Sequence, residues 1–501
     1  MRTAFYRKKW SSLKTGLSNG NNGLKDLKRL SRQIAYSFLD YYLKDCYYEK
    51  DYIDLLCEMT TFSDDLKLTD PGTKALFGII IERLCDDFEE LQTKTYNRVM
   101  CQVVSYCRKI SAGRELDLYL NKFGIHSPEN LLERINKIRE NGNFLNRHKS
   151  VQKILLLSRV TIGADVAITS VIIQRLSEIF PEAEIVLIGG SKLKEVYGGN
   201  SRIKIKEVPY TRKGGLLERL SSWHLVLEII QQETESCSME NTILVDPDSR
   251  LSQLGVLPMV PLGHYFFFDS RSDTSLNRKM SMPELTNLWL NSLTGKESFC
   301  YPKVWIPAPY LDAAKNFYKK LQNIGTKKII TINFGVGGNP RKRVGKPLEE
   351  NILLRLLQEP ETVILLDKGF GDKETAYINS LIHSISEKGY QVRHTPFDSI
   401  GNEIISHGIV GVESRIGEIA SLIANSDEYI GYDSACQHIA AALGTPSLTI
   451  FAGSNNTRFI RRWSAFGPKS CNIVHVDTLT DPASIDVDDI ITRMTNIRHA
   501  M

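Results

Sequence analysis

Residues 428–453, EYIGYDSACQHIAAALGTPSLTIFAG, combine a buried strand, a polar turn and a helix of small residues. The strand is expected to end just before Asp433, and Asp433 and Ser434 then start the helix. Free N–H groups and partial positive charge at such a helix N-terminus suit a diphosphate. The alternative is that Asp433 or Ser434 is only an N-cap. His438 on the same helix either faces the ligand or is a packed residue.

Residues 158–169, SRVTIGADVAIT, form a second turn from a strand into a helix. Gly163 allows a tight turn, and Asp165 stands at the expected helix start, where it would point into a cleft. A carboxylate there could accept a proton from a substrate hydroxyl, with Thr161 and Gly163 beside the acceptor. An N-cap role for Asp165 is the alternative. The segment lacks the G-x-G-x-x-G order and predicts no dinucleotide site.

Residues 333–347, NFGVGGNPRKRVGKP, place a glycine-rich loop with four cations after another strand. Glycines let the backbone approach a ligand closely, and cations suit a phosphate-bearing one. These cations are Arg341, Lys342, Arg343 and Lys346, and a solvated basic loop is the alternative. The P-loop order G-x-x-x-x-G-K-[ST] is absent from this segment.

Residues 246–255, DPDSRLSQLG, follow a further strand. Asp246, Asp248 and Arg250 could orient a substrate at this strand end. The alternative is that Asp-Pro-Asp-Ser only forms a turn, since these residues favour turns.

Two doubly wound α/β units are predicted to position these residues, because short apolar runs alternate with helical patterns. The first unit has expected strands at 153–160, 183–189, 202–208, 242–245 and 264–268, and helices at 166–180 and 216–231. The second has expected strands at 327–334, 362–367, 428–432 and 446–452, and helices at 347–358, 374–386 and 434–444. Ligands bind outside the carboxyl ends of the strands in such sheets, so both units would present loops to one cleft.

The residues before this α/β region have a different pattern. Apolar residues recur at helical spacing from about residue 24 to 140, as in Leu76, Ile79, Ile80 and Leu84, and β-type alternation is scarce. The polar residues 140–150 resemble a linker. We therefore predict an all-helical domain at 1–148, an acceptor-side lobe at 149–305 and a donor-side lobe at 306–501.

Composition narrows the class of protein. The 501 residues carry a formal charge of +5, which is too small over this length to indicate nucleic acid, and no nucleic-acid partner is expected. The nine cysteines are odd in number and scattered, which argues against a disulfide framework and a thiolate zinc site. A reducing cytoplasm is the simplest setting, and neither a cofactor nor a metal is expected.

The N-terminus suggests where the protein could meet a membrane. It is basic, but no apolar stretch of a secretory signal follows it, and no apolar run has the length of a spanning helix. Basic residues alternate there with aromatic ones: Arg2, Arg7, Lys8, Lys9 and Lys14 surround Phe5, Tyr6 and Trp10. This pattern is typical of peripheral contact with an anionic surface, here the inner face of the membrane. A disordered basic tail is the alternative.

Together these segments resemble glycosyltransferase family 9, the lipopolysaccharide heptosyltransferases. SRVTIGADVAIT is similar to the family's S/T-x-x-G-D-V-x-x-T turn, with Ala164 inserted before the aspartate. DSACQHIAAALGTP is similar to D-[ST]-G-x-x-H-x-A-A-A-L-G-T-P, except that Ala435 replaces a glycine. The loop before Pro347 also resembles the family's strand–glycine–basic loop. The resemblance covers about residues 150–480.

The resemblance implies a GT-B fold and an inverting, metal-independent transfer of a sugar, usually a heptose from ADP-heptose. It implies Asp165 as general base and Lys342 or Arg343 as the charge that neutralises the leaving diphosphate. It places Asp433, Ser434, Ala435 and His438 along the donor. Closure of the two lobes would bring the base and the cations together and exclude water. The acceptor, a glycan, a lipid-linked molecule or a protein, stays open, as does the role of the helical domain.

Two other functions fit the same fold. A nucleotide-sugar epimerase would convert the donor without an acceptor, because fold alone does not determine function. A non-catalytic scaffold of GT-B shape would use the helical domain as its working part. The presence of both Asp165 and the 433–438 motif argues against the scaffold, which needs neither.

Overall fold

The computed structural model describes residues 2–19, 23–45, 47–85, 88–140, 145, 150–272 and 279–500. Contacts divide the chain into two compact units. The first comprises Met1–Val160, Leu187–Gly190 and Lys206–Arg278; the second comprises Thr161–Val186, Ser191–Ile205 and Lys279–Met501. Most of the predicted linker, and the boundary at residue 148, lie outside the described residues. The domain limits predicted from the sequence therefore stay a prediction.

The N-terminal region is helical up to Glu140, as predicted, and no strand precedes residue 153 in its described part. Its α-helices are α1 (Arg2–Ser18), α2 (Leu24–Asp45), α3 (Lys50–Thr61), α4 (Leu66–Thr73), α5 (Glu90–Cys107), α6 (Arg114–Lys122) and α7 (Pro128–Glu140). The residues predicted as an α-helix around Leu76 and Leu84 instead wind as a π-helix, Lys74–Ile81, and a 3-10 turn, Glu82–Leu84. Local spacing cannot distinguish these windings, because each still buries one apolar side.

The alternative that the N-terminus is a disordered basic tail is wrong, because residues 2–18 form helix α1. Trp10 is buried: its ring packs edge-on against Phe62, and its Nε1 donates to Glu58 over 3.2 Å. Trp10 is therefore part of the protein core and faces away from solvent. None of the described helices is both long and apolar enough to cross a membrane.

The first sheet contains five parallel strands in the order β3-β2-β1-β4-β5. The strands are β1 (Lys153–Leu157), β2 (Glu184–Gly189), β3 (Ile203–Glu207), β4 (Thr242–Asp246) and β5 (Tyr265–Phe267). The helices along this part of the chain are α8 (Ile162–Ala164), α9 (Ser170–Ile179), α10 (Leu193–Tyr197), α11 (Leu216–Ser236) and α12 (Met282–Thr294). The helix predicted from residue 166 begins as a π-helix, Asp165–Thr169.

The second sheet contains seven parallel strands in the order β12-β11-β10-β6-β7-β9-β8. The strands are β6 (Lys328–Asn333), β7 (Thr362–Asp367), β8 (Val392–Pro396), β9 (Gly408–Glu413), β10 (Glu428–Tyr432), β11 (Ser447–Phe451) and β12 (Cys471–His475). Its helices are α13 (Ala308–Asn323), α14 (Lys346–Leu357), α15 (Asp372–Glu387), α16 (Ile416–Asn425), α17 (Ala435–Leu443), α18 (Thr457–Trp463) and α19 (Val487–His499).

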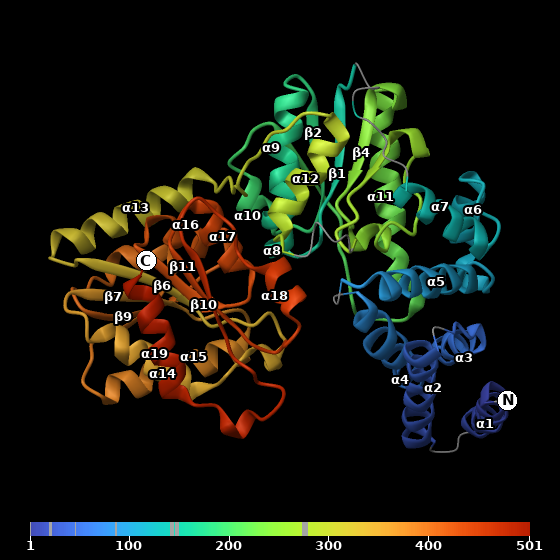
Figure 1. Ribbon diagram of the computed structural model, residues 1–501, viewed down its shortest axis with the longest axis horizontal. Coiled ribbons are helices and arrows are strands. Elements are labelled where there is room, and N and C mark those ends of the chain that lie inside the picture. The colour runs from blue at the N-terminus through green and yellow to red at the C-terminus, as the bar shows by residue number, and fades with distance from the viewer. Residues whose placement is uncertain are drawn as a thin grey trace. The chain divides into compact units, whose positions relative to one another are not determined.

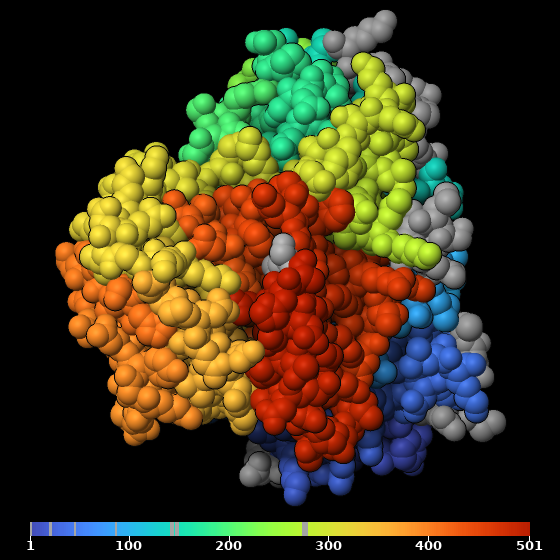
Figure 2. Space-filling model, turned by 60° about the vertical axis from the view of Figure 1, so that its left-hand side comes forward, coloured from blue at the N-terminus to red at the C-terminus, as the bar shows by residue number. Residues whose placement is uncertain are grey.

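Helices cover both faces of this sheet: α13, α16 and α17 lie on one face and α14, α15 and α19 on the other (Figure 1). Strand β7 is fully buried, and its neighbours contribute a contiguous apolar core, which is why such strands read as uninterrupted apolar runs. The C-terminal residues, red in Figure 2, remain at the surface of this unit. The predicted fold class, an α/β protein with two doubly wound parallel sheets after an all-helical region, is confirmed.

Strands β8, β9 and β12 were not predicted from the sequence. Residues 392–396 read VRHTP and are mostly exposed at the edge of the sheet, so they lack the apolar run that marks the central strands. The sequence of β12, CNIVH, is equally short and half-buried.

Arginines join the helical region to the first sheet within the first unit. Arg134 is buried, donates to the Gly255 carbonyl oxygen over 2.7 Å and stacks on the Tyr265 ring. Arg139 pairs with Asp269 over 2.7 Å. A guanidinium offers several donors in a plane, so it can satisfy a carbonyl or carboxylate and cover an aromatic ring together. The helical region is thus packed onto the sheet through its last helix.

Gly255 lies where this last helix packs. Its φ is +84°, and a Cβ there would lie 2.7 Å from Phe267 Cε2 and 2.9 Å from Ile135 Cδ1. We predict that Gly255→Ala lowers the free energy of unfolding by about 2–4 kcal/mol, because it adds backbone strain and overpacking. Urea denaturation measures this change. Gly263→Ala is the control, since its Cβ would meet no atom within 4 Å; equal effects of the two substitutions would show that the packing at Gly255 is not restrictive.

Candidate functional site

Both sheets reverse their strand order, and each predicted constellation lies at such a reversal. In the second sheet the chain leaves β6 toward β7 on one side, whereas β10 pairs with β6 on the other side. In the first sheet the reversal falls between β1 and β4, which pair in parallel. Loops leaving the two strands at a reversal diverge to opposite faces, so the carboxyl ends leave a crevice where ligands bind.

An ion pair joins two of the predicted segments at the reversal of the second sheet. Lys342, from the loop after β6, donates to Asp433 Oδ2 over 2.5 Å and to the Asp433 carbonyl oxygen over 3.3 Å. Gln437, one helical turn further on, donates to Asp433 Oδ1 over 2.6 Å. Asp433 is buried and Lys342 is partly exposed. The structure therefore fixes one cation of the basic loop beside the first residue of the small-residue motif.

The other cations of the loop face elsewhere. Arg343 donates to the Phe334 carbonyl oxygen over 3.0 Å, lies 3.7 Å from Glu349 and covers the Tyr377 ring. Lys346 donates to the Ser380 carbonyl oxygen over 3.3 Å, and Arg341 is exposed. The sequence left open whether Lys342 or Arg343 serves the diphosphate, and in this structure Lys342 is the one beside Asp433.

The N-terminus of α17 carries no side-chain cap. Ser434 occupies the N-cap position without a capping hydrogen bond, and the Asp433 carboxylate is engaged by Lys342 and Gln437. Ser434 therefore holds the N-cap position without capping the helix, and the Asp433 carboxylate does not cap it either. The first N–H groups of α17 keep the partial positive charge that favours an anion.

Gly163 lies against this helix end. A Cβ at Gly163 would lie 3.2 Å from Ala435 Cα and 3.2 Å from His438 Cδ2. Thr161, the N-cap of the short helix α8, is exposed and makes no capping bond. The two residues predicted for the acceptor thus belong to a segment that contacts the predicted donor residues within the second unit.

His438 is a buried histidine and not an exposed one. Its ring lies edge-on to Trp463, with the centroids 6.1 Å apart. Burial lowers the pKa of His438 to about 4; Asp433 opposes this shift and the Lys342 charge adds to it. The imidazole is therefore neutral near pH 7 and can donate one hydrogen bond, from whichever nitrogen carries the proton.

Asp165, which the sequence predicts to point into a cleft, is fully buried in this structure. It is not an N-cap either: it follows α8, its N–H donates to the Thr161 carbonyl oxygen over 2.9 Å, and its Oδ1 accepts from Thr169 Oγ1 over 2.9 Å. The N-cap is Thr161, four residues before Asp165.

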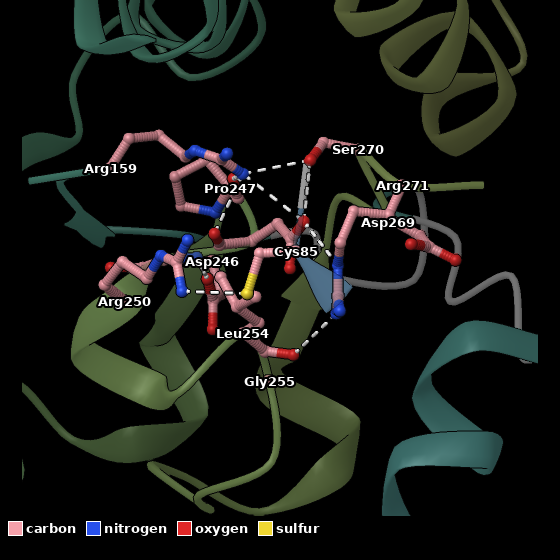
Figure 3. A network of polar contacts seen from close by, with 12 residues as sticks. Cys85, Arg159, Asp246, Pro247, Arg250, Leu254, Gly255, Asp269, Ser270 and Arg271 are labelled. Atoms are coloured by element: carbon pink, nitrogen blue, oxygen red, sulfur yellow. Dashed lines mark hydrogen bonds and ion pairs between the residues drawn. The ribbon is translucent and has the colours of Figure 1, made fainter. Parts of the chain in front are cut away.

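The reversal of the first sheet is filled by a buried polar network (Figure 3). Asp246, at the end of β4, accepts from the Ser249 N–H over 2.7 Å and from the Tyr265 hydroxyl over 2.5 Å. Burial raises the pKa of Asp246 to about 6, although Ser252, Tyr265 and the Ser249 N–H favour its ionised form. The carboxylate of Asp246 thus closes the turn after β4.

Asp248 is the centre of the same network. Its Oδ2 accepts from Ser270 over 2.6 Å and from Arg271 over 3.1 Å, and Arg159 lies 3.4 Å away. Figure 3 shows these three side chains gathered around the loop. Burial disfavours the charge of Asp248, but the guanidinium groups of Arg271 and Arg159 outweigh this and hold its pKa below the usual range.

The backbone of this region is strained. Six described residues other than glycine have positive φ, and four of them lie here: Val160, Asp248, Gln253 and Leu254. Such conformations persist only where the surroundings over-determine them, and they cluster at functional loops. Arg250, the third predicted residue, donates to Cys85 Sγ of the helical region over 3.1 Å, as Figure 3 shows.

Sequence reasoning missed several residues of both networks. Arg159 belongs to the 158–169 segment but was not predicted as a site residue, and Ser270 and Arg271 lie in a segment without a motif; only the folded chain brings the three to Asp248. Their position after strands β1 and β5 was the one available signal.

A third group lies at the carboxyl ends of β6, β7 and β9. Asp367 accepts from Asn333 over 2.5 Å and from Ser414 over 2.8 Å. Burial raises the pKa of Asp367 to about 6. The strand-final position of Asp367 and Asn333 could have indicated this group from the sequence.

Two doubly wound parallel sheets with polar groups at both reversals define the class of fold. Within it, residues 380–480 match the family model of glycosyltransferase family 9 (heptosyltransferase). The match includes Asp433, Ser434, Ala435 and His438. The match confirms the resemblance predicted from the sequence and supports the prediction that the protein is a glycosyltransferase.

Several solved structures are similar to this chain. A family 9 glycosyltransferase from Veillonella parvula is 15% identical, covering 70% of this chain and 98% of its own, with a TM-score of 0.49. The ADP-heptose lps heptosyltransferase II of E. coli is 12% identical, covering 70% and 100%, with a TM-score of 0.43. The E. coli heptosyltransferase WaaC with ADP is 12% identical, covering 69% and 99%, with a TM-score of 0.45. No curated protein matches the sequence.

The raised pKa of Asp246 predicts a pH dependence of stability. Its folded value of about 6 exceeds the unfolded value of about 3.9, so the stability it contributes is present below about pH 4 and is lost as the pH rises through 6. Asp246→Asn cannot titrate. The free energy of unfolding of the variant, minus that of the wild type, should therefore rise by up to about 3 kcal/mol between about pH 4 and pH 7.

Urea denaturation at a series of pH values measures this difference. Asp398→Asn is the control, because Asp398 is exposed, and its difference from the wild type should stay flat. A flat difference for Asp246→Asn as well would show that Asp246 does not titrate in this range.

Proposed function

We propose that this protein transfers a sugar from a nucleotide-sugar donor, a heptose from ADP-heptose, to a hydroxyl acceptor. The proposed transfer is a single displacement with inversion and without a metal ion. The observation that carries the proposal is the Lys342–Asp433 ion pair beside the uncapped N-terminus of α17. It lies at the strand-order reversal, and Asp433 and the start of α17 lie within the segment that matches family 9.

The donor diphosphate is proposed to bind at the N-terminus of α17. Its negative charge would be met by the N–H groups of Ser434 and Ala435 and by the ammonium group of Lys342, which Asp433 holds in place. Neutral His438 would donate a hydrogen bond to the donor without adding charge. The methyl group of Ala435 takes space at this helix end, so it would influence which donor fits.

Asp165 is proposed as the general base. Because it is fully buried here, a hydroxyl acceptor can reach it only after the segment around Thr161 and Gly163 moves from α17. Substrate binding would supply that movement in the proposal. Asp246, Asp248 and Arg250 would hold the loop after β4 and so shape the acceptor side, as their buried contacts support.

The proposed step conserves atoms and charge. The acceptor oxygen attacks the anomeric carbon and its proton passes to Asp165. The bond between the anomeric carbon and the diphosphate oxygen breaks, and the nucleoside diphosphate leaves with the electron pair. Lys342 and the N-terminus of α17 stabilise the charge that develops on this leaving group.

A cytoplasmic setting is part of the proposal. The eight described cysteines are all free thiols, and the cytosol keeps thiols reduced. A cytoplasmic enzyme has access to nucleotide-sugar donors. The acceptor, a glycan, a lipid-linked molecule or a protein, is left open.

Donor binding tests the proposed role of Lys342. Lys342→Gln keeps a hydrogen-bond donor for Asp433 but removes the charge, and we predict about 10- to 100-fold weaker binding of ADP. Calorimetric titration of the full chain with ADP, GDP, UDP and dTDP measures affinity and identifies the base. Lys346→Ala is the matched control, because Lys346 faces Ser380. Unchanged ADP affinity in Lys342→Gln would remove Lys342 from the donor site.

Turnover tests the proposed base. Asp165→Asn keeps an oxygen that can accept from Thr169, so the fold should be retained, but it cannot take a proton. We predict about 10²–10⁴-fold slower release of ADP from ADP-heptose in the presence of an acceptor. Donor affinity and the melting temperature should stay near wild type. Asp312→Asn, on the exposed side of α13, is the control, and near-normal turnover in Asp165→Asn would exclude it as the base.

A further inference from the structure

The positive charge of the protein is concentrated in its first two helices. Residues 2–45 contain ten lysines and arginines against three aspartates, a formal charge of +7, whereas the whole chain carries +5. The rest of the chain is therefore slightly acidic. Such an asymmetry of charge along a chain indicates an anionic partner for the basic end.

Helices α1 and α2 form a hairpin. The Tyr6 hydroxyl lies 2.8 Å from Ser37 Oγ, and Gly23 packs between Leu13 and Leu17 at the turn. The buried Trp10 fixes α1 to the core. The sequence predicts that basic residues interleaved with aromatic ones at the N-terminus contact an anionic membrane surface. Because Trp10 is buried, the largest of these aromatic side chains is not available for that contact.

A hollow of about 550 Å³ opens along α2, with Tyr6 of α1 among its lining residues. Four cations on one side of α2 line it together with the rings of Tyr6 and Tyr36, and Asp40 is the one carboxylate among the lining residues; the cations are Lys25, Lys28, Arg29 and Arg32. These cations share a side because they are spaced three, four and seven residues apart. The α2 helix therefore presents a concave basic surface.

Most of this charge is not neutralised within the protein. Arg29 pairs with Asp26 over 2.8 Å. Among the residues that the structure describes, no carboxylate lies within 4.0 Å of the side-chain nitrogens of Lys25, Lys28 or Arg32. Three cations that converge on one hollow repel one another, and an anionic group between them would relieve this repulsion.

Apolar side chains on the same hairpin are exposed to solvent. The exposed fractions are 54% for Phe5, 41% for Leu24, 43% for Tyr36 and 50% for Leu43. Aromatic and aliphatic groups beside cations suit the interface of a bilayer, where the cations meet lipid phosphates and the rings lie at headgroup depth. A nucleic-acid backbone would match the cations but would leave the leucines without a partner.

We propose that the hollow on α2 binds the phosphate group of an anionic lipid and so attaches the protein to a membrane surface. Lys28 and Arg32 face the headgroup phosphate, and Phe5 and Tyr36 rest in the interfacial layer. The attachment site is distinct from the proposed sugar-transfer site and does not depend on it.

Sedimentation of the full chain with vesicles tests this site. We expect pelleting with phosphatidylcholine vesicles that contain phosphatidylglycerol, little pelleting with phosphatidylcholine alone, and loss of binding as salt screens the charges. Each cation near an anionic surface contributes about a fivefold gain in partitioning. The double variant Lys28→Gln with Arg32→Gln should therefore bind about 30-fold more weakly.

The control variant changes two cations with the same spacing elsewhere. Lys315→Gln with Lys319→Gln, on the exposed side of α13, should leave the partitioning of the protein unchanged. Equal loss in both double variants would reduce the effect to net charge and overturn the site, as would equal binding to neutral vesicles. Tight binding of inorganic phosphate or of an oligonucleotide, without vesicle binding, would also overturn it. Circular dichroism of each variant excludes unfolding as the cause.

Discussion

The constraint on which both candidate sites depend is the order of the parallel strands. Connections between parallel strands are right-handed, so a chain that adds strands first to one side of a starting strand and later to the other must place its helices on opposite faces. At the reversal, the loops after two adjacent strands separate. Strands β6 and β10 stand at such a point in the second sheet, and β1 and β4 in the first. The polar segments of the sequence follow these four strands.

The two reversals are filled differently. At the first, Asp246 and Asp248 are fully buried and satisfied by hydroxyl groups and arginines. Burial of charge is costly unless partners surround it, and the strained backbone of Asp248 and its neighbours is held by that network. At the second, Lys342 is partly exposed and the helix after β10 has no cap. The second reversal therefore keeps hydrogen-bond donors and positive charge available for an anion, whereas the first is closed by the protein itself.

The helical region is joined to the first of these networks. Arg250, after β4, reaches Cys85, and Arg271, which pairs with Asp248, covers the ring of Tyr96 in α5. These arginines follow strands of the first sheet and also contact the helical region. A substitution that displaces their guanidinium groups would therefore weaken both the polar network at the strand ends and the packing of the helices. The opposite end of the region, the hairpin of α1 and α2, carries the excess positive charge. One region thus combines a structural contact with the first sheet and a basic surface.

The sequence by itself determined the layers, because a buried parallel strand must be continuously apolar and its covering helices must be amphipathic. For this reason the apolar run TVILLD was predicted as a strand, which is β7, and the small-residue segment after Tyr432 as a helix. Edge strand β8 was not predicted from the sequence, because an exposed edge strand needs no apolar run. The π-helical winding of Asp165–Thr169 was not predicted either, because it depends on packing. Only tertiary structure decided that Lys342 and not Arg343 lies beside Asp433, and that Arg159 and Arg271 surround Asp248. The residue types determine which charged groups are present. Which of them pair across distant segments depends on which side chains the fold brings within a few ångströms, and that distance cannot be inferred from the local sequence.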